Sequence, residues 1–500
     1  MLARIRNHLS LKWNLSLASI PSENPFSLSP IFFACVLVFF HHAWGRGFFH
    51  DGYLYAALGK NAAVGGHWLV PYLSESQYRI FAEHPPFIFA LEGIFFKIFG
   101  HNFLQARLFS GLWGLGCIMA LSFFLKKEGR VSWGFLAGLF FVSLPFFLKK
   151  VRFPNLDIPL TFFSSLSLYF YYHALNFRIK AFRFWILSGV FFGFALLCKG
   201  PPALFVPLTI FLHLAFTQKL GETLKLPVPW LAFGLGLFIF SLWPILLTLN
   251  GRFDVFELWI QKQFFNTIVS ARGKENFEPF AYVVHLLKYS APWLIAVFFA
   301  CFKFFKKKPL DPLFLLFFCW ILSVLVPLSL MKWKYSHYIL PLYPALAALA
   351  ALPFENISLL AFRKITLIFR WLVVCATLIF LIFPIGTEER RNPELFKLVD
   401  ILNHRKIRPK NWIVVEDAYE YWATCNLSSY LFDASPQNIS AESVPSLINN
   451  KGSDGYLLFL KTQVEAGWNE KTRNSFQMTF QKVIEFPNKG FTVYSDMSLD

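Results

Sequence analysis

The chain has 500 residues, of which 56% are hydrophobic and 19% aromatic, and it carries a formal charge of +18. Only 15% of the residues are charged, whereas soluble globular chains usually contain about 25%, so the composition excludes disorder, collagen and coiled coil. A basic chain is often a nucleic-acid binder, but Phe-rich apolar blocks lie between the basic clusters and fit a bilayer, so we expect a polytopic α-helical membrane protein without a nucleic-acid partner.

The first segment, 1–28, is basic and is interrupted by prolines before any apolar block. It therefore does not read as a cleavable signal, and we expect a cytoplasmic segment followed by an anchoring first span. Apolar runs of spanning length then continue as far as residue 386. They lie near 29–49, 104–125, 132–148, 157–175, 183–198, 200–217, 227–249, 290–305, 312–330, 338–353 and 365–386.

A further apolar run, 85–99, is shorter and decides the topology of every span after it. If it lies at the interface without crossing, most basic clusters fall on the cytoplasmic side, as the positive-inside rule requires. If it crosses, several of those clusters face outward. The first alternative gives about eleven spans, a cytoplasmic N-terminus and a first outer loop with interfacial helices over 50–103. The exceptions that remain on the outer side are Lys149, Lys150 and Arg152.

The last stretch, 387–500, follows the membrane domain over 29–386 and differs from it in composition. Charged residues become frequent, and short apolar segments alternate with helix-like segments, which is typical of a small α/β domain. We expect this domain to be soluble and extracytoplasmic, that is, periplasmic. The predicted strands are 412–415, 456–460, 483–486 and 491–494, and the predicted helices are 394–404 and 442–449.

Polar residues gather at the ends of spans, and the predicted topology puts them on the outer face. They are Asp51, Tyr55, Glu83, His84, Asp157, Lys199, Lys332, Lys334, His337 and Tyr338. A carboxylate at the membrane boundary is costly unless it is solvated or paired. Carboxylates and cations on one face can bind a substrate that has a phosphate and a reacting hydroxyl or leaving group.

Each of these residues also has an ordinary structural explanation. Asp51 and Asp157 could cap helices, Lys199 could mark the end of a span, and the histidines and Tyr338 could belong to an interfacial belt. The cysteines lie mostly in apolar runs without metal-ligand spacing, so neither a disulfide framework nor a zinc knuckle is expected. The joint occurrence of the polar residues on one face is what favours a site.

Several short motifs occur in order along the membrane part. They are DGYLYA from Asp51, GHWLVP from Gly66, EHPPF from Glu83, FGHNFLQARL from Phe99, LDIPL from Leu156, KGPP from Lys199 and YSHYILP from Tyr335. With these motifs the sequence resembles the GT-C class of membrane glycosyltransferases. It is most similar to the group of aminoarabinose lipid A transferases and protein O-mannosyltransferases (ArnT/PMT-like), with a fold of about eleven spans and a small C-terminal α/β domain.

The resemblance implies a sugar donor on a polyprenyl phosphate and an extracytoplasmic acceptor. It implies that Asp51 is the principal catalytic carboxylate, acting as a base or as an orienting group for the acceptor, and that Asp157 is the second acidic residue. Tyr338 corresponds to a position that contacts the donor phosphate, and Lys199 to a further phosphate or pocket residue. Such cations and hydroxyls would stabilise the charge on the departing lipid phosphate.

The sequence departs from the family pattern at several positions. Gly52 follows the first aspartate where an acidic or polar residue is frequent, and His84 replaces a lysine, so that its phosphate contact would depend on pH. Glu83 resembles a position that helps to bind a divalent metal, but Asn276 stands where the partner histidine is expected. A metal at Glu83 therefore stays open, and Arg272 in the same loop is a candidate anion contact instead.

These observations predict a glycosyltransferase of a bacterial-type inner membrane that uses a polyprenyl-phosphate-sugar donor. Lipid A or another envelope glycolipid is favoured as the acceptor, because 250–289 is too short for the β-trefoil insertion of protein mannosyltransferases. A protein O-mannosyltransferase-like enzyme is one alternative. A transporter or flippase of lipid-linked sugar is another, but it predicts mid-span charges and inverted repeats, which the sequence lacks.

Overall fold

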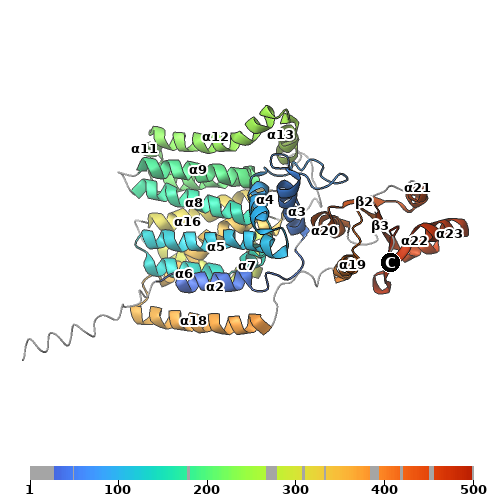
Figure 1. Cartoon of the computed structure of the whole chain (residues 1–500). Coiled ribbons are helices and arrows are strands. Elements are labelled where there is room, and N and C mark those ends of the chain that lie inside the picture. The colour runs from blue at the N-terminus through green and yellow to red at the C-terminus, as the bar shows by residue number, and fades with distance from the viewer. Residues whose placement is uncertain are drawn as a thin grey trace, which may run out of the picture.

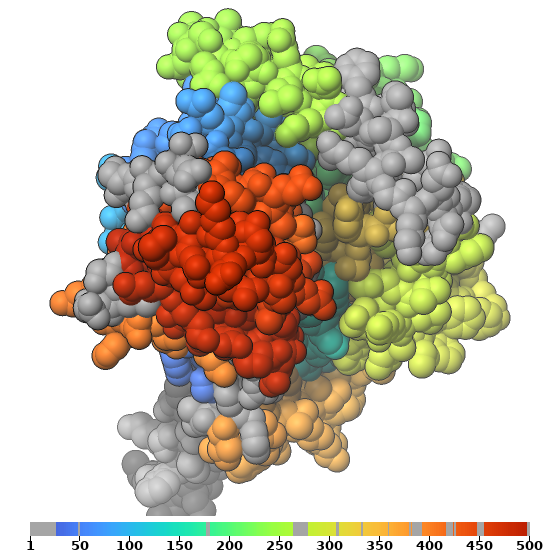
Figure 2. Space-filling model, turned by 90° about the vertical axis from the view of Figure 1, so that its right-hand side faces the viewer, coloured from blue at the N-terminus to red at the C-terminus, as the bar shows by residue number. Residues whose placement is uncertain are grey.

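The protein has two parts, a bundle of long helices and a smaller C-terminal α/β domain at one end of that bundle (Figure 1). The computed structural model describes residues 27–48, 50–176, 181–265, 279–306, 310–331, 334–382, 393–416, 421–449 and 455–497. Figure 2 looks onto the end of the bundle that the C-terminal domain covers, with that domain in orange to red at the front.

The bundle consists of apolar helices, most of which run side by side in Figure 1. They are α2 (Ser29–Phe40), α5 (Phe103–Lys127), α6 (Val131–Val142), α7 (Pro145–Val151), α8 (Asp157–Asn176), α9 (Ala181–Lys199), α10 (Phe205–Phe216), α12 (Pro227–Leu249), α15 (Ala281–Phe305), α16 (Pro312–Leu330), α17 (Tyr343–Ala351) and α18 (Leu359–Ile382). Large apolar side chains such as Phe298 and Trp371 are 67% and 64% exposed on its outside. A helix satisfies its own backbone polar groups, so this surface can face lipid.

Six helices in the described part of the chain are long and apolar enough to cross a membrane, or seven if the bent pair α6–α7 is one span. The shorter α2 and α10 and the more polar α8 and α18 coincide with other predicted spans, and α8 and α18 lie alongside the rest in Figure 1. The chain is a multi-pass membrane protein, and the total of about eleven spans stays a prediction.

One predicted span, 132–148, is not a straight helix. It divides into α6 and α7, which meet at an angle of 70°. Pro145 opens α7, and Leu144 before it is extended, with ψ of 108°. Proline has no N–H and disfavours a helical conformation in the preceding residue, so the helix ends there. The bend redirects the chain just ahead of Lys150.

Two helices, α3 (His50–Gly65) and α4 (Phe87–Phe99), lie across the end of the bundle beside the C-terminal domain (Figure 1). They pack closely, because a Cβ added to Gly59 would lie 2.9 Å from the Glu92 side chain. α4 therefore corresponds to the apolar run 85–99, for which the charge pattern favours a position at the membrane interface. The shorter elements are η2 (Pro201–Leu204), α11 (Leu220–Leu224), α13 (Phe253–Ile260), η3 (Gln261–Phe265), η4 (Ser336–Leu342) and η5 (Leu352–Phe354).

The C-terminal domain is built on a five-stranded sheet with the strand order β2-β1-β3-β5-β4. Its strands are β1 (Asn411–Val415), β2 (Ser435–Ile439), β3 (Tyr456–Lys461), β4 (Gln481–Phe486) and β5 (Phe491–Ser495), and its helices are α19 (Pro393–His404), α20 (Tyr421–Phe432), η7 (Ala441–Ser443), α21 (Val444–Asn449), α22 (Thr462–Ala466), α23 (Glu470–Thr479) and η8 (Pro487–Lys489). β1 is parallel to β2 and β3, whereas β5 is antiparallel to β3 and β4. Trp412 of β1 and Phe459 of β3 lie on interior strands of the sheet and are fully buried.

The four predicted strands are present as β1, β3, β4 and β5, and the two predicted helices as α19 and α21. The sequence did not predict β2 or α20. β2 reads SPQNI and lacks apolar alternation, but it lies at the edge of the sheet, where a proline is tolerated.

Candidate active site

Most of the candidate residues meet at the end of the bundle that carries α3. They come from α3 (Asp51, Tyr55), the turn before α4 (His84), the start of α8 (Asp157), the end of α9 (Lys199) and η4 (His337, Tyr338). Because different elements supply them, the packing of the helix ends builds the cluster, and no single motif does.

A buried ion pair lies at the centre of this cluster. Lys199 Nζ is 2.6 Å from Asp157 Oδ1, and the two side chains are 6% and 8% exposed. Burying either charge alone would be expensive, so the pair fixes both side chains. Asp157 is therefore more than a helix cap, and the capping contact is made by Asn155, whose Oδ1 accepts from the Ile158 N–H at 2.9 Å.

The ammonium group of Lys199 also lies over an aromatic face. Its Nζ is 4.9 Å from the centre of the Tyr338 ring, a distance at which cation and ring attract each other. An ammonium has three N–H donors, and within the described residues the hydrogen bond to Asp157 is the only one from Lys199. Two donors remain for an anionic oxygen, as a donor phosphate would require.

Lys150 is a second buried cation of the site, and the sequence did not single it out as a functional residue. It is only 7% exposed, and its charge interacts with both Asp157 and Asp51. His337 interacts with Asp157 as well. The available signal was the topology, because Lys150 belongs to the outer-face exceptions to the positive-inside rule.

Tyr55 and His84 line the same site from the interfacial side, with ring centres 6.3 Å apart. Burial, together with the charges of Asp51 and Asp157, raises the pKa of Tyr55, so its hydroxyl stays protonated and can donate. Burial and the nearby charge of Lys199 lower the pKa of His84 to about 3. His84 is thus neutral at neutral pH and can offer a phosphate a hydrogen bond but no charge.

A buried arginine holds the loop that leads into α3 and Asp51. Arg107 of α5 is 2% exposed, and its guanidinium donates to the carbonyl oxygens of Ala43, at 3.0 Å, Gly45 and Gly47. Three carbonyls bound by one planar guanidinium fix the path of this loop. Arg107 lies in the FGHNFLQARL motif, but its contact with the Asp51 loop could not be predicted from that motif.

Comparison with known proteins places this geometry in a family. The family model described as dolichyl-phosphate-mannose-protein mannosyltransferase matches residues 83–245, a range that includes His84, Asp157 and Lys199. An uncharacterized protein of Aquifex aeolicus (strain VF5) is 30% identical over 348 residues, 69% of this chain and 67% of the relative. The chain belongs to the ArnT/PMT-like family of GT-C membrane glycosyltransferases.

Named members of the ArnT/PMT-like family are more distant. The undecaprenyl phosphate-alpha-4-amino-4-deoxy-L-arabinose arabinosyl transferase 2 of Proteus mirabilis (strain HI4320) is 24% identical over 305 residues, 59% of this chain. The chain matches only about half of that relative's length, 53%. The crystal structure of ArnT from Cupriavidus metallidurans bound to undecaprenyl phosphate has a TM-score of 0.69 at 16% identity and covers 94% of this chain and 98% of that one. The fold is thus that of ArnT.

The residues around Glu83 do not fit the divalent metal that the ArnT/PMT-like resemblance left open. The Glu83 Oε1 atom is 3.1 Å from Nζ of Lys262 in η3, and Gln263 Nε2 donates to the Glu83 carbonyl at 2.7 Å. The Lys262 ammonium would repel a divalent ion at this oxygen. No group of three metal-ligating side chains occurs in the described part of the chain. Glu83 instead holds η3 against the turn before α4.

The remaining candidates divide into one whose N–H donors bind the end of α16 and two that the structure does not describe. Lys334 Nζ donates to the carbonyls of Leu328, Ser329 and Met331 at 3.3, 2.8 and 2.7 Å. It therefore caps the C-terminal end of α16, where a cation is favoured, and its three donors are engaged. Lys332 and Arg272 lie outside the described residues.

Proposed function

We propose that this ArnT/PMT-like protein transfers a sugar from a polyprenyl-phosphate-linked donor to an extracytoplasmic acceptor, which is lipid A or another envelope glycolipid. The observation that carries the proposal is the buried Lys199–Asp157 pair, whose ammonium keeps N–H donors available beside Tyr338, a residue that also interacts with Asp51. The names of the arabinosyl transferase relatives and the undecaprenyl phosphate of the ArnT crystal structure support a lipid-phosphate donor.

In the proposed reaction the bond between the anomeric carbon of the sugar and the phosphate oxygen breaks, and a bond to an acceptor oxygen forms. The electron pair of the broken bond leaves with the lipid phosphate. Lys199, with Tyr338, stabilises the charge that develops there. Asp51 takes up the proton of the acceptor oxygen or orients that oxygen. Asp157 holds the Lys199 ammonium, and Lys150 adds positive charge to a site with two carboxylates.

The proposal includes an orientation in the membrane. The N-terminus is cytoplasmic, and the site and the C-terminal domain lie on the periplasmic side of an inner membrane. The charge pattern supports this orientation, because most basic clusters then face the cytoplasm. A lipid-linked sugar exposed on the periplasmic leaflet would reach the site from the bilayer, and a glycolipid acceptor would reach it from the same leaflet.

The experiment that tests the proposed function compares the envelope lipids of a strain with and without the gene by mass spectrometry. The reaction joins the sugar of the donor to the acceptor lipid. We therefore expect one class of envelope lipid in the deletion strain to be lighter by the mass of one sugar. Complementation with the wild-type gene should restore that mass. An unchanged lipid profile together with an altered profile of glycosylated envelope proteins would instead indicate a protein acceptor.

A further inference from the structure

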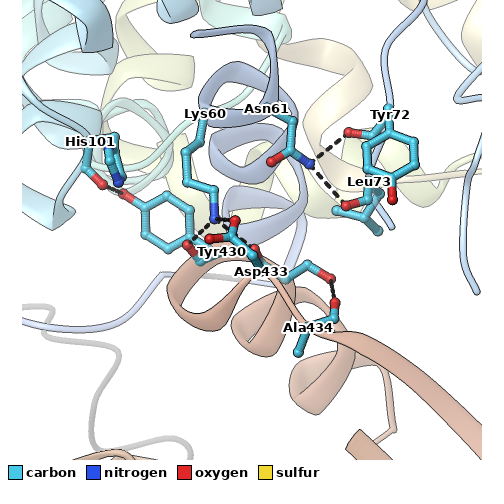
Figure 3. Close-up of polar contacts among 9 residues, drawn as sticks. Lys60, Asn61, Tyr72, Leu73, His101, Tyr430, Asp433 and Ala434 are labelled. Atoms are coloured by element: carbon cyan, nitrogen blue, oxygen red, sulfur yellow. Dashed lines mark hydrogen bonds and ion pairs between the residues drawn. The ribbon is translucent and has the colours of Figure 1, made fainter. Parts of the chain in front are cut away.

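In the described part of the chain, the C-terminal domain contacts the bundle most extensively at α3, the helix that carries Asp51. α20 of the C-terminal domain packs along α3, and Lys60 of α3 points into the C-terminal end of α20 (Figure 3). The Lys60 ammonium donates to the carbonyls of Ser429 and Tyr430 at 2.9 and 2.7 Å and to Oδ1 of Asp433 at 2.5 Å. All three of its N–H donors are thus engaged across the interface.

This contact satisfies groups that the helix itself cannot satisfy. The last four carbonyls of an α-helix have no partner within it, and the helix dipole favours a cation at that end. Asp433 follows α20 with a φ of 53°, a left-handed conformation that ends the helix and brings its carboxylate to Lys60. Lys60 is 2% exposed, and burying an ammonium is costly unless it is paired and hydrogen-bonded, as it is here.

A second anchor contacts the chain on both sides of Asp51. Tyr430 of α20 is 2% exposed, and its hydroxyl donates to the His101 carbonyl at 2.9 Å (Figure 3). Its ring centre is 5.9 Å from that of Phe48, shortly before Asp51, and 5.7 Å from that of Phe103 in α5. The C-terminal domain therefore contacts the chain both before and after Asp51.

We propose that the C-terminal domain positions the catalytic carboxylate through α3, with Lys60 as the positioning residue for Asp51. This inference rests on the proposed function, which assigns Asp51 to the reaction. Asp51 and Lys60 are about two and a half turns apart on one helix, so a shift of α3 at Lys60 also moves Asp51. A misplacement of about 1 Å can cost about 100-fold in rate, although Lys60 is remote from the reacting atoms.

The test measures both order in α3 and transfer. In Lys60→Met we expect the amides of α3 to exchange with deuterium at least about tenfold faster, while exchange in α8 and α9 stays unchanged. We expect kcat for transfer, followed in complemented membranes, to fall about tenfold or more with an unchanged KM for the donor, and Lys60→Arg to recover part of it. Lys482→Gln, which breaks a surface pair within the domain, is the matched control and should change neither quantity.

A double variant separates positioning from mere stability. If Lys60 acts through Asp51, Lys60→Met should cost no further activity when added to Asp51→Asn. A purely structural residue would lower the amount of active protein in both backgrounds. Should Lys60→Met fail to fold, Asp433→Asn and Tyr430→Phe each remove one contact and should give the same pattern with smaller effects.

The outcomes distinguish this inference from the proposed function. Unchanged α3 exchange and unchanged kcat in Lys60→Met, with the activity of Asp51→Asn strongly reduced, would overturn the positioning role alone. Full activity of Asp51→Asn would overturn the assignment of Asp51, whereas the exchange measurement on α3 does not depend on the chemistry.

Discussion

Two clusters of charge, one buried and one partly exposed, lie at opposite ends of the bundle and differ in how completely their charges are paired. At the end that carries α3, the Lys199 ammonium has one carboxylate partner, Asp157. At the other end, the guanidinium of Arg130 contacts Asp311 at 2.8 Å and Glu355 at 2.5 Å. Asp311 also caps α16 by accepting from the Leu313 N–H at 2.8 Å.

The difference indicates which cluster is built for structure and which for a ligand. The Arg130 cluster ties the start of α6, the start of α16 and the chain after η5 together, and each carboxylate has the guanidinium as its partner. The Lys199 cluster is more deeply buried yet leaves donors uncommitted, and a buried polar group without a partner is costly. A fold can retain such an arrangement where a ligand completes it, so we expect the incompletely paired end to be the functional one.

We expect the largest loss of transfer from substitutions in the Lys199–Asp157 pair. Lys199→Met and Asp157→Asn should each lower transfer by about 100- to 1000-fold, because the leaving phosphate loses its cation or the cation loses its orientation. Each should also destabilise the protein, since one buried charge is left alone. The double variant should recover thermal stability but not transfer, and recovery of both would assign the pair to structure alone.

The Arg130 cluster should show the opposite pattern. Arg130→Gln is expected to lower the free energy of unfolding by about 1 kcal/mol, a modest value because the guanidinium side chain is 39% exposed and screened by solvent. Its kcat for transfer should stay within about twofold of the wild type, since the cluster lies at the end remote from the site. Thermal unfolding in detergent measures the change in stability, and the transfer assay in membranes measures kcat. A large loss of transfer without loss of stability would contradict the comparison.

A smaller effect concerns pH. The pKa of His84 is lowered to about 3, against an ordinary value near 6.5. As the pH falls below about 6.5, the unfolded chain protonates His84 whereas the folded protein does not. The free energy of unfolding therefore decreases between about pH 6.5 and pH 3, and the contribution of His84 to it is constant above about pH 7. His84→Gln should leave the shape of the activity profile unchanged between about pH 7 and 9. If the activity of the wild type changed with pH near neutrality and that change were absent in His84→Gln, His84 would act as a cation.

The smallest expected effect is that of metal removal. EDTA should leave transfer within about twofold, because the Glu83 carboxylate already pairs with Lys262. Lys262→Met should lower transfer about threefold by loosening η3, as expected for a partly buried ion pair. Loss of activity with EDTA, recovered by a specific divalent ion, would place a metal that the described residues do not hold.

Much of the site could be predicted because its residues interrupt apolar runs. Asp51, Asp157 and Lys199 stand out at the ends of spans, where charge is expensive. Their pairing could not be predicted, since it depends on how α8 and α9 pack. The hydrogen bonds from Lys334 to the carbonyls at the end of α16 could not be predicted either, because they also depend on how the chain folds.

The fold shows the same division. Long apolar spans and alternating strands could be predicted from local patterns. β2 could not, because an edge strand with few apolar residues has no distinctive hydrophobic periodicity. The bend at Pro145 and the outer position of Lys150 both left signals in the sequence, a proline within an apolar run and an exception to the positive-inside rule. Only the folded chain shows that the bend lies just ahead of Lys150 and that Lys150 interacts with Asp157 and Asp51.

The central claim, that the α3 end of the bundle is a transferase site, is tested most directly with purified protein in proteoliposomes. The liposomes contain a total lipid extract of the deletion strain, which supplies its polyprenyl-phosphate-linked sugars and envelope glycolipids, and mass spectrometry follows product formation by the wild type and by Asp51→Asn. We predict a new glycoside with the wild type and at least about a 100-fold lower yield with the variant. Movement of the lipid-linked sugar between leaflets without any glycoside, or equal product from both proteins, would contradict the account.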